Sequence, residues 1–129
     1  MKRTVLDSSI LISYWMKYVL FKKSDSEVRA AARNLINLLD TNAIVTPVYV
    51  ECVCGSKTGN ELRLMRAFLN EFNVIDKGHV SDADWKKARS GAERIPSDGK
   101  PRQLGDCLIK AIADRFNYDV LPIDKRFAR

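Results

Sequence analysis

Short apolar segments alternate along the chain with longer segments whose apolar residues recur every three or four positions. The short segments predict buried strands, and the longer ones predict amphipathic helices. The expected strands cover residues 2–6, 42–46, 73–75 and 119–123. The expected helices cover residues 8–21, 24–41, 46–55, 62–72, 81–92 and 104–116. Strands that alternate with helices indicate an α/β fold with a mainly parallel sheet and right-handed connections.

Polar residues mark the expected helix ends. Pro47 suits the first position of a helix, where its missing N–H costs no hydrogen bond, so Thr46 is the expected N-cap before it. Ser81 and Asp84 have the spacing of a capping box, and Asn117 is expected in a left-handed conformation after the last helix. The remaining expected N-caps are Ser8 or Ser9, and Ser24 or Ser26.

The composition, with 46% hydrophobic and 29% charged residues, is typical of a soluble globular protein. Residues 1–129 are expected to form one domain. No apolar run approaches the ~20 residues of a membrane-spanning helix, and "MKRTVLDSS" does not resemble a secretory signal because Asp7 interrupts its apolar run. An odd number of cysteines, three, favours free thiols. We therefore expect a cytoplasmic protein without a membrane partner.

The formal net charge of +6 and a pI of about 9.4 favour an anionic partner, with nucleic acid the first candidate. A merely solvated Lys/Arg surface would produce the same charge.

Four acids occupy positions where a carboxylate is unexpected. Asp7 and Asp124 each follow an aliphatic strand, and the carboxyl ends of parallel strands meet at one edge of a sheet. Glu51 and Asp106 lie on the apolar faces of their expected helices. Taken singly, each acid has an ordinary explanation as a turn residue, a cap, a surface residue or a first-turn acid favoured by the helix dipole. Together, they predict a cluster at one edge of the sheet.

Carboxylates drawn together without cations repel one another and lose solvation. A divalent cation removes this cost, and oxygen ligands without a nearby His or Cys set favour Mg²⁺ or Mn²⁺ over zinc. Such a metal activates water and binds phosphoryl oxygens. With the basic net charge, this chemistry favours hydrolysis of a nucleic-acid phosphodiester.

Three segments resemble the PIN domain, and most of all the small PIN ribonucleases of VapC-type toxin–antitoxin pairs. They are "TVLDSSILI", "VTPVYVECVCG" and "LGDCLIKAIADRFNYDVLPIDKRF". The resemblance implies a three-layer α/β/α fold around a central, mainly parallel sheet of four or five short strands. It also implies that the metal-binding and catalytic acids are Asp7, Glu51, Asp106 and Asp124. Family members cut RNA with Mg²⁺ or Mn²⁺, and toxins of this type are inhibited by a cognate antitoxin.

Other residues acquire expected roles from the resemblance, from their position beside the acids or from their apolar character. Ser8, or Ser9, matches the small hydroxyl residue after the first acid and is expected to hydrogen-bond an acid or a metal-bound water, or else to cap the helix. Residues 10–21 could supply a surface for a homodimer or for an antitoxin helix. The cations expected to flank the site and bind RNA phosphates, if they are not simply solvated, are Lys100, Arg102, Lys125 and Arg126.

Two positions depart from the family pattern. The family usually carries Thr two residues before the fourth acid and often Asp two residues after it, where this chain has Pro122 and Arg126. Many members also continue into one more short strand after the final Phe. These differences keep open a PIN-like module that binds RNA or protein without efficient cleavage. An α/β enzyme acting on small phosphorylated metabolites is a further alternative, although no Gly-rich phosphate loop is present.

Overall fold

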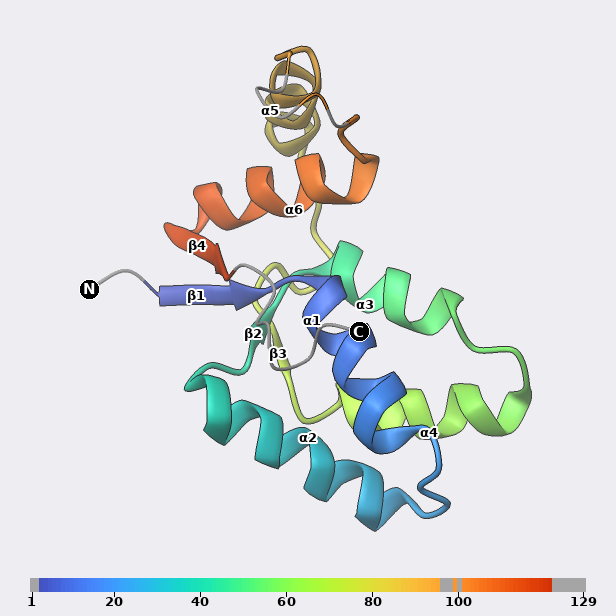
Figure 1. Ribbon diagram of the computed structural model, residues 1–129. Coiled ribbons are helices and arrows are strands. Elements are labelled where there is room, and N and C mark those ends of the chain that lie inside the picture. The colour runs from blue at the N-terminus through green and yellow to red at the C-terminus, as the bar shows by residue number, and fades with distance from the viewer. Residues whose placement is uncertain (1–2, 96–98, 100, 122–129) are drawn as a thin grey trace.

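The computed structural model describes residues 3–95, 99 and 101–121, and these residues form a mixed α/β fold, as expected (Figure 1). The strands are β1 (Arg3–Leu6), β2 (Ala43–Ile44), β3 (Asn73–Val74) and β4 (Tyr118–Leu121). The helices are α1 (Ser8–Tyr14), η1 (Trp15–Val19), α2 (Asp25–Leu39), α3 (Thr46–Cys54), α4 (Gly59–Leu69), α5 (Asp82–Ala92) and α6 (Leu104–Arg115).

The strands of the described residues are short and pair in parallel. β1 pairs with β4, with Leu6 opposite Leu121, and β2 pairs with β3. The two pairs are separate in their backbone hydrogen bonding, whereas the sequence predicts one central sheet of four or five strands. β1 and β2 still lie beside one another, and the Thr41 hydroxyl just before β2 donates to the Thr4 carbonyl of β1 at 2.7 Å.

Helices cover the strands on opposite sides. Figure 1 shows α6 on one side of the β1–β4 pair, with α2 and α4 on the other. The buried side chains form one contiguous core. At its centre is Phe68 of α4, which is fully buried and packs edge-on against the Trp15 ring, with ring centroids 5.3 Å apart. Burial of large apolar side chains of this kind, at roughly 1.5–3 kcal/mol each, is what holds the helices on the strands.

Two expected helix starts are wrong by one or two residues. The N-cap of α1 is Asp7, whose side chain makes no capping hydrogen bond, rather than Ser8 or Ser9. The N-cap of α3 is Val45, and Thr46 is already helical. The reason is a long-range contact: buried Asp76 accepts hydrogen bonds from the backbone N–H and the hydroxyl of Thr46, both at 2.9 Å. Asp76 therefore accepts the hydrogen bonds of the donors at the start of α3, although it belongs to another segment of the chain.

The other expected helix signals are confirmed. Ser24 accepts from the Glu27 N–H at the start of α2, Ser81 and Asp84 form the capping box of α5, and Asn117 has a φ of 62° after α6.

The expected single helix over residues 8–21 is instead α1 followed by the π-helical turn η1. Within the described residues, no helix combines the length and apolar character needed to span a membrane.

Candidate functional site

Asp7 lies at the carboxyl end of β1, between that strand and α1. Because Leu6 pairs with Leu121, this is also the carboxyl end of β4. Two neighbouring hydroxyls hold the half-buried Asp7 carboxylate: Ser9 Oγ donates to Oδ2 at 3.1 Å and Ser8 Oγ lies 3.4 Å from Oδ1. The hydroxyls thus orient Asp7 rather than capping α1.

Glu51, from the middle of α3, reaches the same place. Buried Ser8 donates its hydroxyl hydrogen to Glu51 Oε2 at 2.8 Å, a shorter contact than the one to Asp7. A serine hydroxyl has one hydrogen to donate, so the bond to Glu51 is the stronger of the two. Glu51 Oε1 is buried and has no hydrogen-bond partner among the described residues, which is costly for a carboxylate oxygen.

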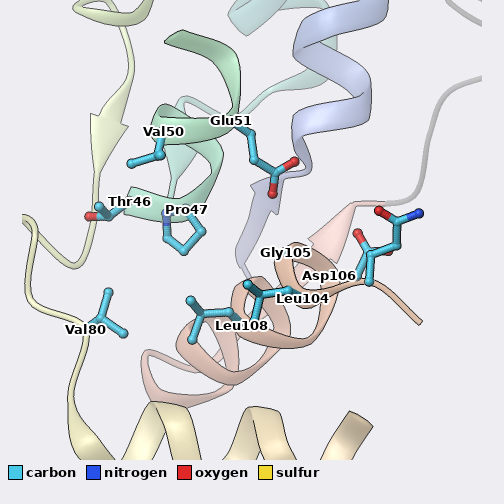
Figure 2. A pocket seen from close by; sticks show the side chains of 10 residues that line it. Thr46, Pro47, Val50, Glu51, Val80, Leu104, Gly105, Asp106 and Leu108 are labelled. Atoms are coloured by element: carbon cyan, nitrogen blue, oxygen red, sulfur yellow. The ribbon is translucent and has the colours of Figure 1, made fainter. Parts of the chain in front are cut away.

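Gly105 makes room for the Glu51 carboxylate at the start of α6. A Cβ at position 105 would collide with Glu51 Oε1 and lie 3.0 Å from Glu51 Cδ. Figure 2 shows the Glu51 carboxylate directed toward the first turn of α6, where Gly105 and Asp106 lie. With the Glu51 carboxylate in this position, only a glycine fits at position 105, because a Cβ would displace the end of the Glu51 side chain.

Asp106, in the first turn of α6, is electrostatically coupled to Asp7. Partial burial and the charge of Asp7 together raise the pKa of the Asp106 carboxyl above its ordinary value. The charge of Asp7 also acts on Cys52, next to Glu51 on α3: burial, Glu51 and Asp7 raise the pKa of its thiol to about 12. Asp7 therefore acts electrostatically on groups of both α3 and α6.

Two open cavities meet at Asp106. One, of about 420 Å³, is lined by Glu51, Asp106 and mainly apolar side chains, among them Val50, Leu104 and Leu108 (Figure 2). The other, of about 440 Å³, is lined by Asp7, Asp106, Ile109, Lys110, Asp119 and Val120. Asp106 thus lines both an acidic cavity and a mainly apolar one.

Arg102, the one expected phosphate-binding cation among the described residues, lies in a different environment. Arg102 is exposed, but its guanidinium donates to the backbone carbonyls of Gly91, at 2.9 Å, and Arg94. It is directed to the end of α5 and not to the acidic residues. The other residues expected at the site lie outside the described residues, as does Pro122. They are the acid Asp124 and the cations Lys100, Lys125 and Arg126.

Sequence reasoning missed four residues around the site: Gly105, Asp76, Lys110 and Asp119. "LGD" contains a glycine directly before the predicted acid, which is a usable signal for a close approach. Lys110 follows Asp106 by one helical turn, another available signal. Asp76 and Asp119 carry no local signal, because only the packing of distant segments gives them their neighbours.

The donor chemistry of the site suits a hard divalent cation. Asp7, Glu51 and Asp106 offer carboxylate oxygens, the ligand type that Mg²⁺ prefers, and one of these oxygens is buried without a partner. No Lys or Arg of the described residues forms an ion pair with any of the three. Over the same residues, however, no three His, Cys, Asp or Glu side chains are grouped closely enough to hold a metal ion.

Compared with known protein families and with curated proteins, the sequence gives no match. The function of the site therefore has to be argued from its residues.

Proposed function

We propose that the protein is a metal-dependent endoribonuclease of PIN type that acts as the toxin of a toxin–antitoxin pair. The observation that carries the proposal is the shared environment of Asp7, Glu51 and Asp106. Asp7 and Glu51 both contact the Ser8 hydroxyl, Glu51 lies against the Gly105 backbone, and the charge of Asp7 raises the pKa of Asp106, next to that glycine. Such an arrangement costs free energy in the absence of a cation, and a cost of this kind is typical of a functional site.

In this proposal Asp7, Glu51 and Asp106 would hold Mg²⁺ or Mn²⁺, together with Asp124. The bound metal would activate water and offset the charge of the scissile phosphate. Ser8 restricts the Glu51 carboxylate to one orientation, and Ser9 does the same for Asp7. Gly105 allows Glu51 to approach α6. These three residues would set the positions of the acids before RNA binds.

The proposal includes the three-layer α/β/α arrangement of the PIN fold. The parallel β1–β4 pair supports it, because Asp7 follows β1 and Asp124 follows the segment that contains β4. It also includes an antitoxin and a homodimer as partners. A set of exposed apolar residues on α1, η1 and the following turn would serve such interfaces: Ile12, Met16, Leu20 and Phe21.

A second candidate is a PIN-like module that binds RNA or a protein without efficient cleavage. It is favoured by the lack of a three-ligand metal group among residues 3–95, 99 and 101–121. It is also favoured by Pro122 and Arg126, which replace the residues usual in the family.

Cleavage of a single-stranded RNA pool in Mn²⁺, with and without chelator, tests the proposal. Asp106→Asn should abolish cutting, and Ser8→Ala should slow it about 10- to 100-fold because it releases a metal-binding side chain. Asp82→Asn is the matched control and should cut normally, since Asp82 is also an acid in the first turn of a helix, and its side chain is exposed. Equal cutting by Asp106→Asn and wild type would contradict the proposal. RNA binding without any chelator-sensitive cutting would favour the binding module.

A further inference from the structure

We infer that Lys110 is a phosphate-binding residue of this site, which contacts the RNA backbone next to the phosphate held at the acids. This inference rests on the proposed function for the identity of its ligand. It replaces the role that the sequence suggested for Arg102, because that guanidinium is already bound to backbone carbonyls.

Lys110 lies close to the acids. Lys110 lines the acidic cavity with Asp7, Asp106 and Asp119, and it is the one cation among the described residues that line either cavity. It follows Asp106 by four residues on α6, which places the two Cβ atoms about 5–6 Å apart on one helix face. A strand of RNA has a phosphate at every nucleotide, so a phosphate at Asp106 has neighbours within reach of a lysine one helical turn away.

The contact of Lys110 with Asp114 is weak. Its ammonium lies 3.8 Å from Asp114 Oδ1, and its side chain is 71% exposed. An exposed pair at this distance is worth little and exchanges readily with solvent. Asp114 also has a closer partner, Lys87, whose ammonium lies 3.2 Å from Oδ2. Lys110 can therefore turn to a phosphate while Asp114 keeps an ion pair.

The charge around the cavity also calls for a cation. The Asp7 and Asp106 carboxylates repel a phosphodiester, and in the proposed function a metal at the acids would offset that repulsion only for the phosphate it contacts. A neighbouring phosphate needs a cation of its own, and the ammonium of lysine is a compact point charge suited to this contact. Lys110 is the described lining residue that provides one.

Lys87 provides a matched control. It is the same residue type, shares the Asp114 partner and is 58% exposed, but it does not line the acidic cavity. A lysine that serves only to pair with Asp114 should matter less at position 110, where the contact is longer, than at position 87. A phosphate-binding role predicts the reverse.

The experiment measures binding of a fluorescein-labelled oligouridine by anisotropy across a salt series, in an Asp7→Asn background that blocks cleavage. Lys110→Ala should weaken binding about three- to tenfold and make the slope of log K against log salt less steep by about 0.7. Lys87→Ala should change neither, and Lys110→Arg should retain most of the affinity. Circular dichroism of each variant confirms that the fold is intact.

The outcomes separate this inference from the proposed nuclease activity. Equal binding by Lys110→Ala and Lys87→Ala, with a wild-type protein that cuts RNA, overturns the role of Lys110 alone. Lys110-dependent binding by a wild-type protein that does not cut supports Lys110 and contradicts the nuclease. Absence of any RNA binding overturns the role of Lys110.

Discussion

Replacing Gly105 with alanine is expected to separate folding from function at the acidic site. The new Cβ would occupy the position of Glu51 Oε1, so the Glu51 side chain has to move. The atom displaced is the end of a flexible side chain and not backbone, and the fold can therefore accommodate the change. The displaced carboxylate would lose its 2.8 Å hydrogen bond from Ser8.

The expected effect on stability is modest because two terms oppose each other. Alanine in a helix is favoured over glycine by roughly 0.5–1 kcal/mol. Loss of the Ser8–Glu51 hydrogen bond costs about 1.5–3 kcal/mol, because its acceptor is a carboxylate. Exposure of the buried Glu51 oxygen offsets part of that cost. The free energy of unfolding should therefore fall by about 2 kcal/mol or less.

The expected effect on activity is large, since a metal-binding acid would leave its position. RNA cleavage in Mn²⁺ should fall at least about 100-fold, and the stabilisation of the fold by Mn²⁺, seen as a shift of the urea midpoint, should diminish. Gly91→Ala is the control: Gly91 lies in α5 with no atom near its added Cβ, so it should be slightly stabilising and fully active. A folded Gly105→Ala protein with wild-type cleavage and metal response would refute the placement of Glu51 against α6.

Three further outcomes test the described contacts. Asp76→Ala should lower the free energy of unfolding by about 2 kcal/mol, measured in urea, because it leaves two donors at the start of α3 without an acceptor. Burial opposes ionisation of Asp84, but hydrogen bonds from Arg115 and the capping box outweigh it and lower its pKa. The resulting stability is present above the unfolded-state pKa near 4 and is lost as the pH falls through the folded value. Asp84→Asn should therefore destabilise by about 1–3 kcal/mol at neutral pH and progressively less in acid; a pH-independent difference would contradict the ion pair. A disulfide reagent at pH 8 should modify exposed Cys54 rapidly and Cys52, with its pKa of about 12, only on unfolding. Equal rates would show that Cys52 is not buried beside the acids.

The helices and strands were largely predictable because their signals are local. Apolar spacing identified α2 and α6, and the side chains of Ser24 and Ser81 correctly marked the starts of α2 and α5. Local spacing cannot show what a side chain contacts elsewhere. Thr46 looked like an N-cap, yet it is helical because Asp76, thirty positions later, accepts both of its hydrogen bonds.

The acids of the candidate site were also predictable from local signals, whereas their contacts were not. The sequence alone singled out Asp7, Glu51 and Asp106, because a carboxylate at a strand end or on an apolar helix face conflicts with its surroundings. Only the tertiary structure decided how Glu51 is held, through Ser8 on one side and Gly105 on the other. These contacts join α1, α3 and α6, whose approach depends on the packing of the whole core. No pattern within a single element contains that information.

The cations show most clearly which contacts cannot be predicted from the sequence. Position in the sequence put Arg102 beside an acid, but the long, flexible side chain satisfies the carbonyls at the end of α5 instead. No sequence pattern assigned a role to Lys110, and only the tertiary structure places it in the wall of the acidic cavity. Among the described residues, the packing of α6 against β4 and the pairing of β4 with β1 decided which cation lines the acidic cavity.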